Sequence, residues 1–564
     1  MRHAVCTAAL VLTIVLLACP ATADEATLPG EVTTPYPTIH HLAVEWHIEG
    51  DLNTNGKVDV RYRAVGEKTW APALPLRRVP AGQSVGTTPI FRWRNKHSGS
   101  VFDLKPDTEY EIHLKLVDPD GGSAERTVRA RTRAIPKPMA DAPVRRVTPD
   151  TLKAVLAAAR PGEVVLLGEG EYGRVDVPAG GEAGRPLVVR GDGRAVCRGV
   201  YVRQCKHVIV EKLTVHGPID LQGSSDCGVR YCRVHVQGKG FGIGTRGRPG
   251  ATNCYIADNI VTGRTPWASE AMGASGENAG EGIQITGPGN VICYNRVDSL
   301  RDCISTMEDR GTGLQVCIDI YNNDVRFAAD DGIEADFCMH NCRILRNRLT
   351  NCFMGLSSQP GLGGPTYFIR NVMYNLTHAP FKLHRHSTGD VCLHNTVVKV
   401  GDGMACFTYE TFDRAYFRNN LCIGGPTGGA WYGKYRPGRG LAVYMRAAGP
   451  NCDFDYDALG SHTLPLRGQI GKQSFDDLAG LRRGPHERHA VEAGMSVFAD
   501  VPFPAKPIPG YDPPDLRPRP GSVVVDKGQR LPNVNDAFRG QGPDMGAYEA
   551  GQDLPHYGPR SSGA

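Results

Sequence analysis

The stretch AADDGIEADF, residues 328–337, carries four carboxylates close together: Asp330, Asp331, Glu334 and Asp336. Like charges at such spacing raise one another's pKa values or require a cation nearby. The group could bind a metal ion, carry out acid–base chemistry, or lie in a solvated turn whose carboxylates accept backbone N–H bonds. The stretch alone does not decide among these three interpretations.

Acids recur at the head of three similar segments, EGIQI (281–285), DCIST (302–306) and DGIEA (331–335). In each, we expect the isoleucine to point inward and the acid to point outward. Successive parallel strands lie about 4.8 Å apart, so the three acids would form one column. The column predicts a catalytic surface or a Ca²⁺ site, because Ca²⁺ binds oxygen ligands. The expected Ca²⁺ ligands are Glu281, Asp302 and Asp331.

A basic segment, FKLHRHSTG, follows the acids along the chain. Lys382 stands 48 residues after Glu334, which is two repeats of the period described below, or on the order of 10 Å. We expect Lys382, His384 and His386 to point outward on the face that carries the acids, with Arg385 close by. An acidic patch beside a basic patch suits an extended, partly charged ligand.

Two longer segments, 264–280 and 426–440, are expected to rise as loops beside this face. They carry tryptophan and tyrosine side chains, which fit the apolar face of a sugar ring if exposed; burial against the fold is the alternative for each. The residues expected to contact a substrate are Trp267, Gln284, Asp336, Arg385, His386, Trp431 and Tyr432.

The elements that would position these residues are indicated by a repeated asparagine. Asn323, Asn347, Asn371, Asn395 and Asn419 follow one another at intervals of 24 residues, and Asn295 and Asn259 extend the series upstream at intervals of 28 and 36. A fixed period of this length with β-type composition indicates a solenoid. Asparagine at a repeated turn tolerates a left-handed backbone and can stack its amide on the next. We predict a structural ladder.

The cysteines fit the same repeat. Of 17 cysteines, Cys6 and Cys19 lie in the N-terminal segment. The remaining 15 are an odd number, so they cannot all form disulfides with one another. Cys254 and Cys342 each precede a ladder position by five residues, as Cys227 does if Cys232 takes that position. We predict buried free thiols, with one or two disulfides as the alternative.

Residues 36–135 alternate apolar and polar in short runs, as in KVDVRYRAV and EYEIHLKLVD, which predicts a β-sandwich. The run from Leu104 through Pro106 and Thr108 to Tyr110 resembles the tyrosine corner of fibronectin type III domains, and Trp46 suits their early-strand tryptophan. The resemblance covers about 100 residues. A proline-rich linker is expected over 136–147.

From residue 148 to about 550 the chain resembles the pectate-lyase-like superfamily. A helix with Thr148 as N-cap and Pro149 at its first position runs directly into a strand, as at the N-terminal cap of such folds. The end of this region resembles the closing segment of exported β-helix proteins and predicts a C-terminal cap, followed by a flexible tail over 551–564. The predicted fold class is all-β: a right-handed parallel β-helix solenoid preceded by a small fibronectin type III-like β-sandwich.

The N-terminus predicts export. Residues 1–23 show a short basic start, an apolar run and a small-residue cleavage site before Asp24, with lipid attachment at Cys19 as the alternative. Net charge is +5, and loss of Arg2 leaves +4, too little to indicate nucleic acid. We therefore expect an extracellular or periplasmic monomer that acts on a polysaccharide, with neither a nucleic-acid partner nor a membrane-spanning segment after cleavage.

The resemblance implies an enzyme acting on polysaccharides. Polygalacturonase-type hydrolases carry Asp-Gly on one rung and Asp-Asp-Cys on the next, and EGI, RDCI and ADDGI are similar in form, although the family's Gly-His-Gly and Arg-x-Lys motifs are absent. Hydrolysis is favoured because no Lys or Arg is expected on the rung beside the acids. The alternatives are a Ca²⁺-dependent lyase of a uronate-containing glycan, with Lys382 or Arg385 as base, and a non-catalytic glycan-binding surface protein. The expected catalytic residues are Asp302, Asp330, Asp331, Glu334, Lys382 and His384.

Overall fold

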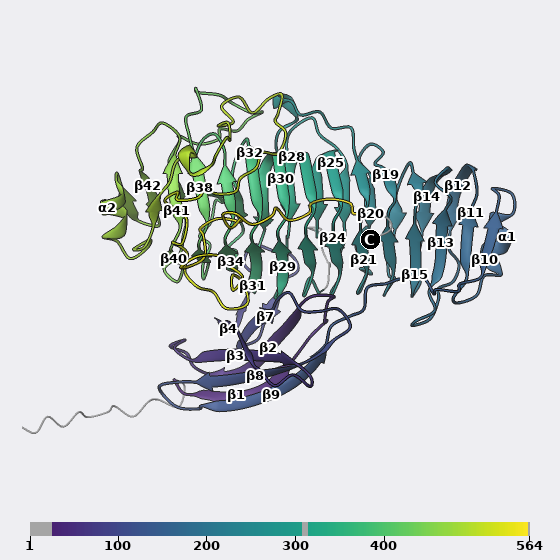
Figure 1. The fold of residues 1–564 in the computed structure, drawn as a ribbon, viewed down its shortest axis with the longest axis horizontal. Helices are drawn as coiled ribbons and strands as arrows, with labels where there is room; N and C mark the ends of the chain where they lie inside the picture. The colour runs from purple at the N-terminus through teal and green to yellow at the C-terminus, as the bar shows by residue number, and fades with distance from the viewer. Residues whose placement is uncertain (1–24, 307–313, 562–564) are drawn as a thin grey trace, which may run out of the picture.

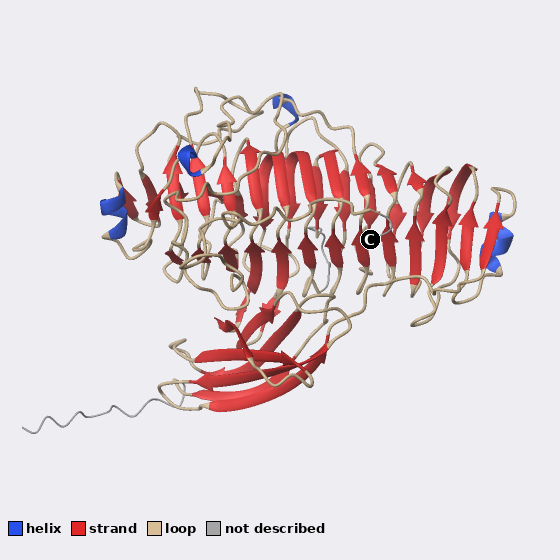
Figure 2. Ribbon diagram, in the orientation of Figure 1, coloured by secondary structure: helices blue, strands red, loops and turns tan. Residues whose placement is uncertain are grey.

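The computed structural model describes residues 25–306 and 314–561, which form two β-structured units (Figures 1 and 2). The smaller unit comes first in the chain and packs against one side of a long solenoid. The predicted signal peptide, 1–23, and Cys19 lie outside the described residues. Within the described ranges, no helix has the length and apolar character needed to cross a bilayer.

The smaller unit is built from seven antiparallel strands in the order β1-β2-β7-β4-β3-β8-β9. Trp46 is fully buried in its core, and the Lys105 N–H donates to the Tyr110 hydroxyl at 2.9 Å, the hydrogen bond expected of a tyrosine corner. Its first strand begins before the predicted boundary at residue 36. The likeness to fibronectin type III stays a prediction. The strands are β1 (Thr27–Thr33), β2 (Leu42–Gly50), β3 (Lys57–Ala64), β4 (Ala71–Val79), β7 (Lys96–Val101), β8 (Glu109–Val117) and β9 (Ala124–Arg131), with a separate pair β5 (Gly82–Gln83) and β6 (Arg92–Trp93).

The solenoid contains two long sheets, one of 13 and one of 22 strands, whose neighbours pair in parallel except for β42 and β43. Inward-facing Val, Ile, Leu and Cys side chains fill the space between them. This architecture confirms the predicted parallel β-helix. The first sheet contains β10 (Val144–Val147), β11 (Val164–Leu167), β13 (Leu187–Gly191), β15 (Val208–Glu211), β18 (Gly228–Arg230), β21 (Tyr255–Ala257), β24 (Val291–Cys293), β27 (Asp319–Tyr321), β29 (Cys342–Leu345), β31 (Leu362–Ile369), β34 (Thr388–Leu393), β37 (Tyr416–Arg418) and β40 (Asp453–Asp455).

The second sheet carries the acidic segments on its outer face. Its strands are β12 (Gly170–Asp176), β14 (Ala195–Tyr201), β16 (Thr214–Val215), β17 (Ile219–Asp220), β19 (Arg233–His235), β20 (Phe241–Gly244), β22 (Ile260–Thr262), β23 (Glu281–Gln284), β25 (Arg296–Leu300), β26 (Asp302–Ser305), β28 (Asp324–Glu334), β30 (Arg348–Ser358), β32 (Val372–Leu376), β33 (Phe381–Leu383), β35 (Thr396–Val398), β36 (Met404–Phe407), β38 (Leu421–Gly424), β39 (Val443–Met445), β41 (Ala458–Ser461), β42 (Gly468–Ile470), β43 (Gln473–Phe475) and β44 (Val491–Glu492).

Short helices cover both ends of the solenoid (Figure 2). α1 (Leu152–Ala157) begins after Thr151, so Thr151 and not the predicted Thr148 is its N-cap. At the other end, α2 (Leu478–Arg482) buries Leu481 in the core. The predicted linker, 136–147, is shorter than expected because β10 already pairs with β11 in the solenoid.

The C-terminal segment does not close the end of the solenoid as predicted. After a short 3₁₀ helix (Met495–Val497) the chain runs back along the outside of the solenoid, where Val524 and Met545 pack with Val398 (Figure 1, yellow). The described part of the predicted flexible tail, residues 551–561, is packed against the solenoid, since the Arg560 guanidinium lies 2.7 Å from the Asp258 carboxylate.

The asparagine ladder is present and buried. The backbone N–H and the side-chain amide of Asn347 both donate to Oδ1 of Asn371, each at 3.0 Å, and the same paired contact recurs on the neighbouring rungs. Cys232 occupies the expected position, since its N–H donates to Asn259. The prediction is wrong at Asn419: that residue has a φ of +60° and bonds to Gln529, while Asn420 takes the ladder position. The members are Asn259, Asn295, Asn323, Asn347, Asn371, Asn395, Asn420 and, finally, Asp457.

All 15 cysteines of the described chain are free thiols, and 14 of them are buried. Twelve of them pack among aliphatic side chains inside the solenoid, with Cys406 against them, as compact apolar groups, whereas Cys293 and Cys317 lie in outer clusters that include side chains of the smaller unit. The predicted free thiols are confirmed, and the alternative of one or two disulfides is not found within the described ranges.

The two units are joined by a buried polar network. The Arg343 guanidinium lies 2.5 Å from Asp319, His41 of the smaller unit lies 2.8 Å from the same carboxylate, and all three side chains are fully buried. Asp103 of the smaller unit pairs with Arg346 at 2.7 Å. Arg343 also donates to Ser100 of the smaller unit, so separating the units would leave these buried polar groups unpaired at about 1–3 kcal/mol each, and we infer a fixed arrangement of the two units.

The ladder generates the first prediction. Asn347→Ala should lower the free energy of unfolding by at least about 3 kcal/mol, because it leaves several buried donors and acceptors unpaired at about 1–3 kcal/mol each. Chemical denaturation followed by circular dichroism measures the loss. The control Asn53→Ala removes an exposed hydrogen bond to Asp120 and should lower it by only about 0.5–1.5 kcal/mol. Equal losses for the two variants would contradict a structural role for the ladder.

Candidate active site

The three acids at the heads of the strands share one column on the second sheet. Glu281 of β23 pairs with Asp302 of β26, and the pairing of Ile304 with Ile333 brings Asp302 into line with Asp331 of β28. The Asp331 N–H donates to Oδ1 of Asp302 at 2.7 Å. The alignment agrees with the sequence prediction.

Lys382 of β33 reaches into this acidic group from two rungs away. Its Nζ lies 2.5 Å from Oδ2 of Asp331 and 3.6 Å from Oε1 of Glu334. Ser357 stands between Glu334 and Lys382 in the strand register, and its small side chain leaves room for the lysine to pass. The acidic and basic patches predicted from the sequence therefore form one site.

Arg301 is a second cation that the sequence analysis missed. It precedes β26, and its guanidinium lies 3.5 Å from Asp302 and 3.5 Å from Asp330. The arginine is visible in the motif RDCI. Strand alternation predicts side-chain direction only within a strand, so it did not predict where Arg301, just before β26, would point. The expectation that no Lys or Arg stands beside the acids is wrong, because Arg301 and Lys382 both do.

Burial dominates the electrostatics of the acids. Asp302 is only 4% exposed, and burial, reinforced by the neighbouring Glu281, Asp330 and Asp331, raises the pKa of Asp302 well above its ordinary value. Burial, followed by the charges of Asp336 and Asp302, does the same to the pKa of Glu334. Burial also raises the pKa of Glu281 and of Asp330 to about 7.

Lys382, unlike these acids, is held in its charged form. Burial opposes its charge, but Asp331 and Glu334 outweigh burial and raise the pKa of Lys382 well above its ordinary value. The ammonium therefore stays protonated at neutral pH, and Asp331 supplies the opposing negative charge. Environments that push neighbouring groups toward different protonation states are typical of acid–base sites.

The acids fit a metal ion only in part. One oxygen each of Asp302, Asp331 and Glu334 lies within 4.8 Å of the others, whereas the predicted set contained Glu281 in place of Glu334. Ca²⁺ takes about six to eight oxygen ligands. Since the Lys382 ammonium already lies against two of these three carboxylates, the residues fit an ammonium–carboxylate cluster better than a Ca²⁺ site.

The outer face of the sheet continues from Lys382 toward the C-terminal rungs. Lys382 pairs with Phe407 of β36, and beyond it lies a cavity of about 380 Å³. His384 lies 2.8 Å from Glu410, and its ring contacts Tyr409, which is 78% exposed. His384 was predicted as a site residue, whereas the sequence analysis did not name Phe407, Tyr409 or Glu410. The side chains that define the cavity are His378, Phe407, Tyr409, Arg436, Tyr444 and Arg446.

The two predicted loops, 264–280 and 426–440, pack on each other, with the Gly433 N–H donating to Ser269 Oγ at 3.1 Å. Of their three predicted aromatic contacts, only Trp431 is exposed, with the Arg436 guanidinium 4.1 Å from its ring centroid. Trp267 donates to the Pro507 carbonyl at 3.0 Å in a largely apolar cluster, and Tyr432 is buried in the same cluster. Trp267 and Tyr432 therefore hold the loops in place.

The remaining predicted contacts are placed differently from expectation. Asp336 is fully buried and accepts from Ser357 Oγ at 2.7 Å, and Gln284 is nearly buried and donates to the Thr245 carbonyl at 3.2 Å. β33 ends at Leu383, and Arg385 and His386 both have positive φ, so strand alternation does not extend to His386. The Arg385 N–H donates to Glu410 at 3.1 Å.

No protein-family profile matches the sequence, and no curated protein matches it. Among solved structures, the PL6 family alginate lyase AlyGC is similar, with 13% sequence identity, a TM-score of 0.34 and coverage of 57% of this chain and 51% of that one. The chain thus spans about half the length of that structure. A likeness of this size assigns no function, so the argument rests on the geometry of the site.

The raised pKa of Asp330 generates a prediction about stability and pH. A folded-state pKa of about 7, above the ordinary 3.8, stabilises the fold at low pH, and that contribution is lost as the pH rises through 7. Asp330→Asn keeps the uncharged form at every pH. Because wild type loses the contribution progressively between pH 3.8 and pH 7, the excess of the variant's free energy of unfolding over wild type should be larger near pH 8.5 than near pH 5 by more than about 1 kcal/mol.

Urea denaturation at the two pH values measures the difference. Asp476→Asn, at an exposed position, is the matched control and should show the same offset from wild type at both. If Asp330→Asn also shows a constant offset, Asp330 does not titrate near neutral pH in the fold.

Proposed function

We propose that this protein is a glycoside hydrolase that cleaves a polysaccharide lying along the outer groove of β26, β28, β33 and β36. The observation that carries the proposal is the buried acid column in which Asp331 pairs with Lys382 at 2.5 Å while burial raises the pKa of Asp302. Hydrolysis of a glycosidic bond requires this division between an ionised and a protonated carboxyl group.

The division assigns a role to each acid. Asp302, protonated at neutral pH, donates its proton to the glycosidic oxygen as the bond to the anomeric carbon breaks. Asp331 attacks the anomeric carbon from the other side, and water then hydrolyses the covalent intermediate; the oxygens of Asp302 and Asp331 lie within 4.8 Å of each other, close to the short carboxyl separation of retaining enzymes. The hydroxyl group of that water ends on the anomeric carbon, and its one released proton returns to Asp302.

Lys382 favours hydrolysis over elimination. A lyase needs a base that removes the proton beside a uronate carboxylate, and Asp331 and Glu334 raise the pKa of Lys382, so this lysine is a poor base near neutral pH. We therefore assign Lys382 to charge balance and substrate binding. Hydrolysis is preferred on this ground, and not on the absence of cations expected from the sequence.

The cavity beyond Lys382 supplies binding surface for further sugar units. Tyr409 and Tyr444 present rings beside Arg446, so the cavity offers both flat apolar faces and hydrogen-bond donors. Aromatic faces of this kind suit the apolar face of a sugar ring. The exported location and the monomeric state expected from the sequence remain part of the proposal.

A Ca²⁺-dependent lyase of a uronate-containing glycan is the second candidate. It is favoured by the convergence of oxygens from Asp302, Asp331 and Glu334 within 4.8 Å. It would require Lys382 to leave Asp331 and to act as the base, or Arg385 to do so. A non-catalytic glycan-binding protein is the third candidate. It is not favoured, because binding alone does not require a group of buried acids that repel one another, which costs the fold stability.

A panel of neutral and acidic polysaccharides distinguishes the three candidates. We expect new reducing ends without the absorbance of unsaturated uronates. Reducing ends together with that absorbance would identify a lyase, and a loss in the presence of chelator would add the metal. Neither signal on any polysaccharide that binds would identify a binding protein.

Single substitutions test the roles. Asp331→Asn should lower turnover by at least about 10³-fold with little change in KM, because its interaction forms only in the transition state. Circular dichroism checks that the fold is retained, and Asp476→Asn serves as the control with unchanged turnover. Full turnover in folded Asp331→Asn would contradict the assignment.

A further inference from the structure

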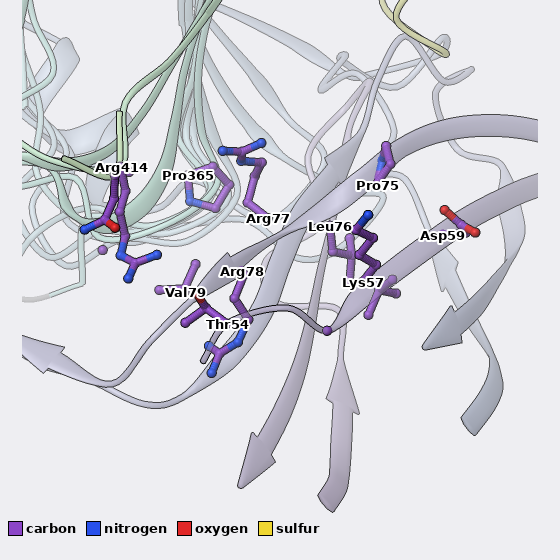
Figure 3. Close-up of a pocket in the computed structure, with 15 residues that line it drawn as sticks. Thr54, Lys57, Asp59, Pro75, Leu76, Arg77, Arg78, Val79, Pro365 and Arg414 are labelled. Carbon is purple, nitrogen blue, oxygen red and sulfur yellow. The ribbon is translucent and has the colours of Figure 1, made fainter. Parts of the chain in front are cut away.

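A second cavity lies where the smaller unit meets the solenoid (Figure 3). Its walls come from β3 and β4 on one side and from β31, β34 and Arg414 on the other. The acid column belongs to the other long sheet, so the two sites occupy different faces of the solenoid. The volume, about 400 Å³, falls in the range of cavities that hold small organic ligands.

The cavity is strongly basic. Lys57, Arg77, Arg78 and Arg414 line it, against a single acid, Asp59. Arg78 is compensated, because its guanidinium pairs with the buried Asp51. Within residues 25–306 and 314–561, no carboxylate forms an ion pair with the other three cations, which leaves an excess of positive charge facing the cavity.

The Arg77 guanidinium has a fixed orientation and no close counter-charge. It lies 4.3 Å from the ring centroid of Tyr416, an arrangement that fixes the plane of the donors. Burial lowers the pKa of Arg77, as expected for a cation that lacks a close counter-charge. The nearest acid acting on it, Asp453, already pairs with Arg418 at 2.7 Å.

The walls are rigid. His41 of the smaller unit lies 2.8 Å from the buried Asp319, and Asp103 pairs with Arg346 at 2.7 Å across the junction. Gly363 and Gly389 form bare backbone at the base of the cavity, where a Cβ on Gly389 would lie 2.3 Å from the Gly363 carbonyl oxygen. Pro75, Leu76 and Pro365 add apolar surface between the charged groups.

We propose that this junction cavity binds an acidic sugar unit, with its carboxylate or sulfate group held by Arg77 and Arg414 and its ring against the apolar wall. A planar guanidinium matches both oxyanions through paired hydrogen bonds. The cavity is larger than an inorganic anion needs, and its apolar wall would be left unused by one. The smaller unit thereby completes a glycan-binding site that neither unit forms alone. The proposal does not depend on the chemistry of the acid column.

Titration calorimetry on the full chain tests the site, with a short oligouronate and a sulfated oligosaccharide as probes. Asp331→Asn is the parent, so that cleavage cannot consume the probe. Adding Arg77→Gln or Arg414→Gln should weaken binding of at least one acidic probe about tenfold or more. Adding Arg61→Gln, at an exposed position on the same strand as Lys57, should leave binding unchanged. Binding should also weaken with added salt.

A neutral oligosaccharide of equal length and inorganic sulfate complete the experiment. Unchanged affinity for both acidic probes in the Arg77 and Arg414 variants, or equal affinity for the neutral oligosaccharide, overturns the proposal. Sulfate binding as tightly as the oligosaccharides overturns the sugar assignment. Arg77→Lys guards against misfolding, since it keeps the charge but removes the planar donors and should still weaken binding. Loss of turnover in the acid column leaves every one of these outcomes unaffected.

Discussion

A line of buried side-chain amides sets the register on which the rest of the solenoid depends. From Asn295 to Asp457 each member receives two hydrogen bonds from the rung before it, so a rung cannot slip by one residue without leaving buried polar groups unpaired. A one-residue slip would also exchange the inner and outer faces of each strand. The ladder therefore holds Glu281, Asp302 and Asp331 in one column, even though the loops between their rungs differ in length.

Register alone would produce a column of carboxylates that repel one another. Two effects reduce this repulsion in the site. Lys382 and Arg301 supply positive charge from the side, and burial favours the protonated form of the other acids. The outcome is a cluster in which neighbouring carboxyl groups hold different protonation states. That difference is what acid-assisted hydrolysis uses, and it follows from a fold that stacks identical strand positions a few ångströms apart.

Much of this architecture could be predicted from the sequence, because periodicity reports directly on backbone register. The recurring segments EGI, DCI and DGI predicted the column, and the 24-residue spacing predicted the solenoid and the buried thiols. It chose Asn419 in place of Asn420, since one rung has 25 residues and spacing alone does not reveal an added residue. The spacing also placed Lys382 too far from the acids to contact Asp331. The contact depends on the length of the lysine side chain, which reaches past Ser357, and a repeat spacing does not report side-chain length. The junction cavity was also missed, since Arg77 and Arg414 line one cavity only because the two units dock.

The protonation states of the acid column are the central claim, and carboxyl-carbon NMR of protein labelled at Asp and Glu measures them directly. In a titration from pH 5 to pH 9, the signals of at least two carboxyl groups should still show the protonated form at pH 7. Each signal is assigned by its absence from the spectrum of Asp302→Asn or Glu334→Gln. If every carboxyl group of the column instead titrates below pH 5, burial does not divide the acids into two classes, and the site does not carry out acid-assisted hydrolysis.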